Sequence, residues 1–140
     1  MEDITTISPA IMAYLGDALY ESVIRRYLIL ERGIRKPRHL HQSAVELVRA
    51  DTQAKIVHLI EGELEAEEAE IIRKGRNMKT GHVPPKVQPI VYRYSTAWET
   101  LLGYLYLTGR EERMETLIRR GIDLIVHGLK EEKHAGTGID

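Results

Sequence analysis

The chain has 140 residues, of which 43% are hydrophobic and 29% charged, with a net charge of −1 and no cysteine. This length suits one domain with one core, and the lack of Cys excludes disulfides and thiolate metal sites. The acidic start, MEDITTISPA, has no apolar signal segment, and no apolar run approaches the about 20 residues of a bilayer span. We therefore expect a cytoplasmic protein with no membrane contact.

The first predicted helix covers residues 10–28, because Ser8 suits an N-cap and Pro9 suits the first helical position. Its apolar side chains cover most of the circumference, as in a central buried helix. Gly16 in its middle costs about 1 kcal/mol relative to Ala. Asp17 beside it is a carboxylate among apolar neighbours, which is costly unless it is paired. Together they indicate a close helix crossing and a carboxylate with a cationic partner. The ordinary structural interpretation is that Asp17 pairs with an Arg of the core.

The middle of the chain separates its charges. After a basic linker over residues 33–37, helical patterns cover residues 38–48 and about 51–62. A short acidic helix over residues 65–74 follows, and the six Glu between residues 61 and 70 are interpreted as a solvated face. Residues 73–98 then contain six Lys or Arg and no acid, so this stretch favours a polyanionic partner.

Residues 75–93 have no helical period and contain two Gly and three Pro, which predicts a long loop. Loops of this length are usually functional or disordered. Its polar side chains are of types that contact phosphates, and a flexible loop with a chance basic excess is the alternative. The candidate contact residues of this basic stretch are Arg73, Lys74, Arg76, Asn77, Lys79, Thr80, His82, Lys86 and Arg93.

Residues 93–108 return to a helix that is apolar nearly all round and again carries one Gly, Gly103, and one acid, Glu99. Gly109 ends this helix. A last amphipathic helix is predicted over residues 111–129, and residues 131–140 are expected to fray. No alternating β pattern of useful length and no internal repeat occurs, so the predicted fold class is all-α.

The two apolar helices share one Gly and one acid each. If they cross near Gly16 and Gly103, Asp17 and Glu99 lie near the crossing and repel each other unless a cation bridges them. Oxygen ligands without Cys favour Mg²⁺, with Mn²⁺ as a substitute. With a phosphate delivered by the basic stretch, this predicts a metal-assisted phosphodiester site.

Two sequence blocks resemble the ribonuclease III family. Tyr14-Leu15-Gly16-Asp17-Ala18-Leu19-Tyr20 looks like the family signature, and residues 98–107 resemble its second catalytic block. Residues 74–84 and 92–96 are similar to the Mini-ribonuclease III branch, a catalytic domain without a double-stranded-RNA-binding domain. The resemblance covers about residues 9–129 and implies one catalytic domain over residues 1–140, with Asp17 and Glu99 as catalytic metal ligands. The two other carboxylates of the family site fall on Ala13 and Thr96.

The resemblance implies a homodimeric endonuclease that cuts both strands of double-stranded RNA and leaves 5′-phosphates, with the basic stretch contacting RNA. It also implies maturation of the large-subunit (23S) ribosomal RNA precursor, with a large-subunit ribosomal protein as a further candidate partner. Two other interpretations stay open. One is a catalytically inactive helical module that dimerises or binds RNA. The other is an unrelated helical hydrolase of small phosphates, which would usually need more Glu, Asp or His at helical spacing.

Overall fold

The computed structural model describes residues 4–79 and 81–137, with the backbone alone for residues 129–137. The helices of this part are α1 (Pro9–Leu30), α2 (Pro37–Val48), α3 (Ala50–Ile60), α4 (Ala66–Asn77), α5 (Pro89–Leu107) and α6 (Glu111–Thr137). Short 3₁₀ turns occupy Ile4–Thr6 and Glu61–Glu63, and no strand occurs among the described residues. The all-α prediction is therefore confirmed. In this part of the chain no helix is both long and apolar enough to cross a membrane.

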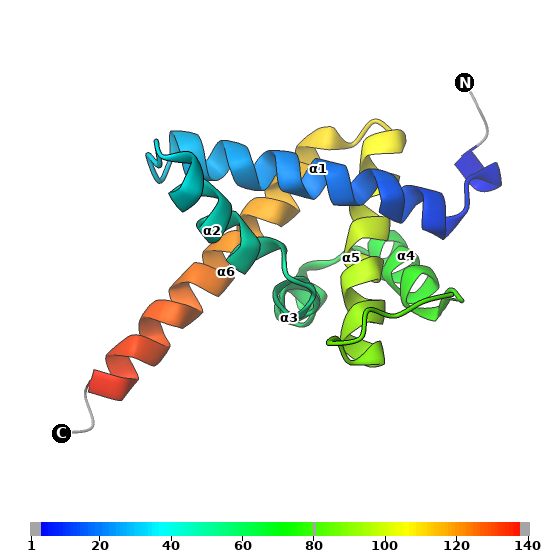
Figure 1. Ribbon diagram of the computed structural model, residues 1–140. Helices are drawn as coiled ribbons and strands as arrows, with labels where there is room; N and C mark the ends of the chain where they lie inside the picture. Colours follow the sequence, from blue (N-terminus) through cyan, green and yellow to red (C-terminus); the bar gives the residue numbers. More distant parts are fainter. Residues whose placement is uncertain (1–3, 80, 138–140) are drawn as a thin grey trace.

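Helix α5 is the centre of the fold. Figure 1 shows α1 lying across α5, with α3 and α4 on either side of it, and α5 contacts all three. Trp98, Leu101, Leu102 and Leu105 of α5 are fully buried, as the all-round apolar pattern of this segment predicts. Core side chains of α1, α2, α3, α4 and α6 complete this cluster, while the C-terminal part of α6 extends away from the other helices (Figure 1).

Helix α1 is not buried all round, in contrast to its sequence pattern. Its inner face supplies Tyr20, Ile24 and Leu28 to the core. Its outer face leaves Ile11 59% exposed and Tyr14 83% exposed. The expectation of a fully buried first helix is therefore wrong for the single chain, because the other helices cover only one side of α1.

Three predicted boundaries differ from the structure. Helix α4 continues through Gly75 to Asn77, and α5 begins at Pro89, so the segment between them is residues 78–88 rather than 75–93. Helix α4 can continue because Gly75 packs on α5: a Cβ there would lie 2.8 Å from Thr100 Oγ1 and 2.9 Å from Ala97 Cα. Residues 131–137, expected to fray, continue α6 to Thr137.

The acidic run is not entirely a solvated face. Glu68 is fully buried, and Arg113 of α6 donates two hydrogen bonds of 2.8 Å each to its carboxylate. Hydrogen bonding by Arg113 is the main reason that the pKa of Glu68 lies below its usual value. Glu68 also accepts the backbone N–H of Glu65, which completes a capping box at the start of α4. The solvated-face prediction is wrong at Glu68, because its partner is distant in sequence.

Candidate active site

Helices α1 and α5 cross at two glycines. A Cβ on Gly16 would lie 1.8 Å from the carbonyl oxygen of Glu99, and a Cβ on Gly103 would lie 1.9 Å from the carbonyl oxygen of Met12. Both distances are far below van der Waals contact, so only Gly permits this approach. The predicted glycine crossing is confirmed, and it fixes the backbone of Glu99 against the turn of α1 that carries Asp17.

The crossing brings the two predicted carboxylates together. Asp17 is exposed on α1, and Glu99 on α5 is only partly exposed. Burial raises the pKa of Glu99 from 4.5 to about 8, and the hydrogen bond and charge of Asp17 act in the same direction. Two acidic groups within hydrogen-bonding reach in a half-buried place repel each other when both are ionised.

Glu21 lies one turn after Asp17 and adds its charge to the same place. Its charge also raises the pKa of Glu99. Glu21 forms an i,i+4 ion pair with Arg25, with 3.6 Å between the carboxylate and the guanidinium. Glu21 is therefore a neighbour of the carboxylate pair whose own partner is Arg25.

The donor set fits a hard divalent ion. Among the described residues no group of three or more His, Cys, Asp or Glu side chains forms a ready-made metal cage. Mg²⁺, however, commonly takes only one or two protein carboxylates and fills its shell with water and phosphate. The mutual repulsion of Asp17 and Glu99 is what a bridging cation would relieve. Ala13 and Thr96, where the resemblance places further carboxylates, are both buried.

Sequence reasoning did not single out Gln53 of α3. Its side chain is 4% exposed, and its Nε2 donates to the carbonyl of Val48 at 2.9 Å. The Gln53 amide also interacts with the carboxylate of Glu99, and this interaction counters part of the rise in the pKa of Glu99. The signal was present in the sequence: Gln53 shares the apolar face of α3 with Ile56, Val57 and Ile60. A polar residue on such a face needs a buried partner.

Part of the predicted basic stretch is held within the protein. Arg73 makes an exposed pair with Glu70, with 2.9 Å between Nε and Oε2. Arg76 lies over the ring of Tyr94, with 5.8 Å from Cζ to the ring centroid, and donates to its hydroxyl at 3.4 Å. Asn77 ends α4 and accepts from Arg76 Nε at 3.2 Å. These residues belong to a helix end rather than to a free loop.

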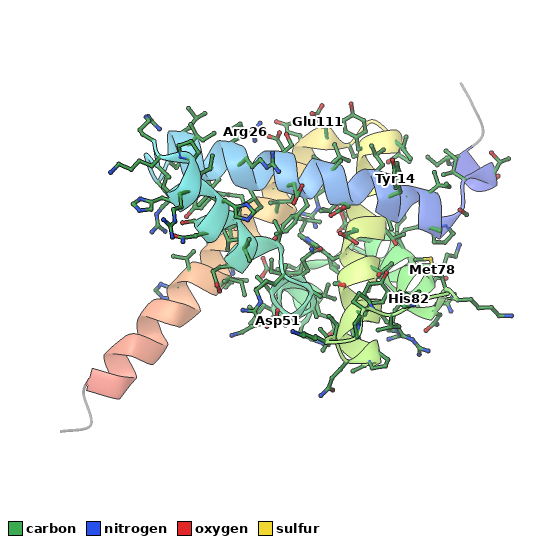
Figure 2. All side chains as sticks on the ribbon, in the orientation of Figure 1. Tyr14, Arg26, Asp51, Met78, His82 and Glu111 are labelled. Carbon is green, nitrogen blue, oxygen red and sulfur yellow. The ribbon has the colours of Figure 1, made fainter. Side chains whose placement is uncertain are left out.

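Further exposed residues of the basic stretch lie later in the chain. Lys79, His82, Lys86 and Arg93 are exposed, and Figure 2 shows His82 on the segment between α4 and α5. Lys86 and Arg49 line a cavity of about 600 Å³ at the start of α3. Lys74 lines a different hollow, of about 400 Å³, beside the N-terminal turn. Thr80 lies outside the described residues.

Comparison with known proteins places the chain in a family. The model of the ribonuclease III domain matches residues 10–110. Mini-ribonuclease 3 of Symbiobacterium thermophilum is 42% identical over 88% of this chain and 94% of that protein. Mini-ribonuclease 3 of a Thermoanaerobacter species is 38% identical over 89% of this chain and 87% of that protein. A crystal structure of a Fusobacterium nucleatum protein has a TM-score of 0.76 and 28% identity, covering 91% of this chain and 98% of that one.

An all-helical fold with two carboxylates at a glycine crossing is consistent with these matches. The chain belongs to the ribonuclease III family, whose members are double-strand-specific endoribonucleases. Its resemblance within that family is to the Mini-ribonuclease 3 proteins, over most of its length.

Proposed function

We propose that this protein is a single catalytic domain that hydrolyses double-stranded RNA at Asp17 and Glu99 with the help of Mg²⁺, for which Mn²⁺ can substitute. The observation that carries the proposal is the pair of carboxylates brought within hydrogen-bonding reach where α1 and α5 cross. The products expected of this chemistry are 5′-phosphomonoesters, as in the ribonuclease III family.

Asp17 and Glu99 would hold the ion, which when bound polarises the scissile phosphate and makes a bound water more acidic. The protein contributes the rigid placement of these two groups. Glu99 is fixed by the close contact of its backbone with Gly16, and Asp17 follows Gly16 directly in α1. Because the raised pKa of Glu99 reflects burial and the nearby Asp17, ion binding requires the loss of a proton at this pair.

The substrate grip is proposed to lie in the residues between α4 and α5. Duplex RNA is recognised by shape, phosphates and 2′-hydroxyls, so exposed cations suit it better than a base-reading pocket. Lys79, His82, Lys86 and Arg93 are exposed and free to meet phosphates. Arg73, Lys74, Arg76, Asn77 and Thr80 remain candidate contacts, although Arg73 and Arg76 would have to exchange a partner within the protein.

A homodimer accounts for the apolar outer face of α1. Tyr14 lies on α1 near its crossing with α5 (Figure 2), and with Ile11 it presents large apolar side chains to solvent. A second copy would cover this face and place two sites against the two strands of a duplex. The apolar exposure supports this assembly.

For the cellular role we propose maturation of the 23S ribosomal RNA precursor in the cytoplasm, at the base-paired stalk of that precursor. A large-subunit ribosomal protein is proposed as a partner that presents this RNA. The support is the similarity to Mini-ribonuclease 3 proteins, together with the absence of a spanning helix from the described residues.

Incubation of the purified protein with a long duplex RNA, with and without Mg²⁺, tests the proposal. We expect cleavage of both strands only with the ion, and 5′-phosphates on the products. Asp17→Asn and Glu99→Gln should each lower the rate by more than about 100-fold, because even supporting groups around a metal ligand cost about 10–100-fold. Asp123→Asn, a substitution on the exposed face of α6, is the matched control. RNA binding without cleavage by the wild-type protein would instead favour an inactive helical module, which the neutral residues Ala13 and Thr96 would then explain.

A further inference from the structure

Gln53 is a polar residue in an apolar place. It lies on the face of α3 that packs on α5, next to Ile56, Val57 and Ile60, and it is 4% exposed. Its Oε1 is buried and has no hydrogen-bond partner among the described residues. An unpaired buried amide oxygen is costly, and Leu or Met would occupy the same volume without that cost. Packing alone therefore does not account for Gln at this position.

The amide of Gln53 joins two parts of the fold. Its Nε2 donates at 2.9 Å to the carbonyl of Val48, and Val48 is the last residue of α2. The last carbonyls of a helix have no partner within the helix, so this bond anchors the Gln53 side chain to a rigid point. The same amide interacts with the carboxylate of Glu99 on the neighbouring helix α5 and favours its ionised form. Gln53 thus ties Glu99 to the end of α2 through one side chain.

We propose that Gln53 is a positioning residue for the catalytic carboxylates, which holds Glu99 in the orientation that binds the divalent ion. This inference rests on the proposed function. A site with only Asp17 and Glu99 has few fixed oxygen atoms, so the orientation of each one matters more than in a site with four carboxylates. Groups that orient metal ligands typically change metal affinity or activity by about 10–100-fold when they are removed. Gln53 supplies such support from a third helix.

The test measures metal binding directly, with the metal-free full-length protein and Mn²⁺ alone, followed by electron paramagnetic resonance of the free ion. Gln53→Met keeps the length of the side chain and removes the amide. We expect its Kd for Mn²⁺ to rise by about 10- to 100-fold. Gln42→Met, the same substitution at an exposed position of α2, should leave that Kd unchanged. Duplex RNA binding without divalent ion should be the same in all three proteins.

A double-mutant cycle shows whether Gln53 acts through Glu99. In a Glu99→Gln background, Gln53→Met should add no more than about a twofold loss of Mn²⁺ affinity, because the group that it positions is already changed. Fully additive losses would overturn the proposal. If Gln53→Met does not fold by circular dichroism, Gln53→Asn keeps the amide but is too short to reach both partners, and the same rise in Kd is expected.

The outcomes separate this inference from the proposed function. An unchanged Mn²⁺ affinity in Gln53→Met, with a lowered melting temperature, would show that Gln53 only caps α2 and would overturn the inference while leaving the nuclease site intact. If the wild-type protein neither binds Mn²⁺ nor requires a divalent ion to cleave duplex RNA, the proposed function itself fails.

Discussion

The backbone of Glu99 touches Gly16 so closely that a single methyl group on Gly16 would lie 1.8 Å from the Glu99 carbonyl oxygen. One of the two close glycine contacts of α1 with α5 therefore occurs at the residue that carries one carboxylate, and next to the residue that carries the other. In this protein the helix crossing and the proposed catalytic site therefore coincide.

Gly16→Ala should destabilise the fold by about 3 kcal/mol, the upper part of the usual range for overpacking, because the methyl group meets backbone that no rotamer change can move. Chemical denaturation followed by circular dichroism measures this. Gly128→Ala in α6 is the control, since nothing lies within 4 Å of a Cβ there. It should stabilise the protein by up to about 1 kcal/mol through helix propensity. Equal effects of the two substitutions would contradict the close crossing.

The stability of the metal-free protein should fall as the pH rises from about 4.5 to about 8. Burial and Asp17 raise the pKa of Glu99 from 4.5 to about 8 in the folded chain, so over this window the folded state keeps a proton that the unfolded state has lost. Each step upward in pH then favours unfolding.

Thermal melting across this pH range, in wild type and in Glu99→Gln, measures the contribution of Glu99. The Gln variant cannot titrate at this position, so its melting temperature should decline less over the same range. Added Mg²⁺ should restore wild-type stability most strongly at the alkaline end, because the ion binds the ionised pair. Parallel pH profiles for the two proteins would show that the pKa of Glu99 is not raised in the folded chain.

Lys79→Met combined with Lys86→Met should weaken duplex RNA binding without lowering the melting temperature, because both side chains are exposed and exposed charges add little to stability. If both contact phosphates, the slope of log K against log salt should become shallower by about 2, on the basis of roughly 0.9 per contact on duplex DNA. Fluorescence anisotropy over a salt series measures this.

Arg76→Met is expected to affect stability, unlike the double variant of Lys79 and Lys86. Arg76 stacks on Tyr94 and bonds its hydroxyl, so its loss should lower the melting temperature as well as RNA affinity. Lys36→Met with Arg38→Met, in the basic linker before α2, is the comparison variant. A larger loss of salt dependence in this variant would mean that the linker, and not the segment before α5, holds the duplex.

Tyr14→Asp should convert the proposed homodimer into a monomer. Tyr14 is 83% exposed in the single chain, and a buried aromatic anchor in an interface is typically worth about 2 kcal/mol or more. The Kd of the dimer should therefore rise by about 30-fold or more, as measured by sedimentation equilibrium. Leu30→Asp, at a 69% exposed site at the far end of α1, should leave the dimer intact. A wild-type monomer that cuts both strands would contradict the assembly.

Local signals in the sequence predicted much of this protein. The 3.6-residue periods predicted the all-helical class, and Ser8 with Pro9 predicted the start of α1 at Pro9, where the Ser8 side chain accepts from Ile11 N–H. The mid-helix glycines Gly16 and Gly103 predicted a close crossing, because a close backbone contact offsets the unfavourable helix propensity of glycine. These features depend on neighbours within a few residues, or on a residue type, such as glycine in the middle of a helix, whose presence there has one main physical explanation.

Tertiary structure alone decided which polar groups meet. Glu68 looked like one more solvated acid, yet it is buried against Arg113, 45 residues away. Gln53 was not singled out as a site residue, yet it lies between Val48 and Glu99. Gly75 looked like the start of a loop, yet it continues α4 because it packs on Thr100. In each case the favourable contact joins segments far apart in the chain, and a local sequence pattern contains no information about which distant residue will pack there. The sequence by itself therefore determined the helices and the two acids of the proposed site, while the packing of α3, α4 and α6 around α5 determined their partners.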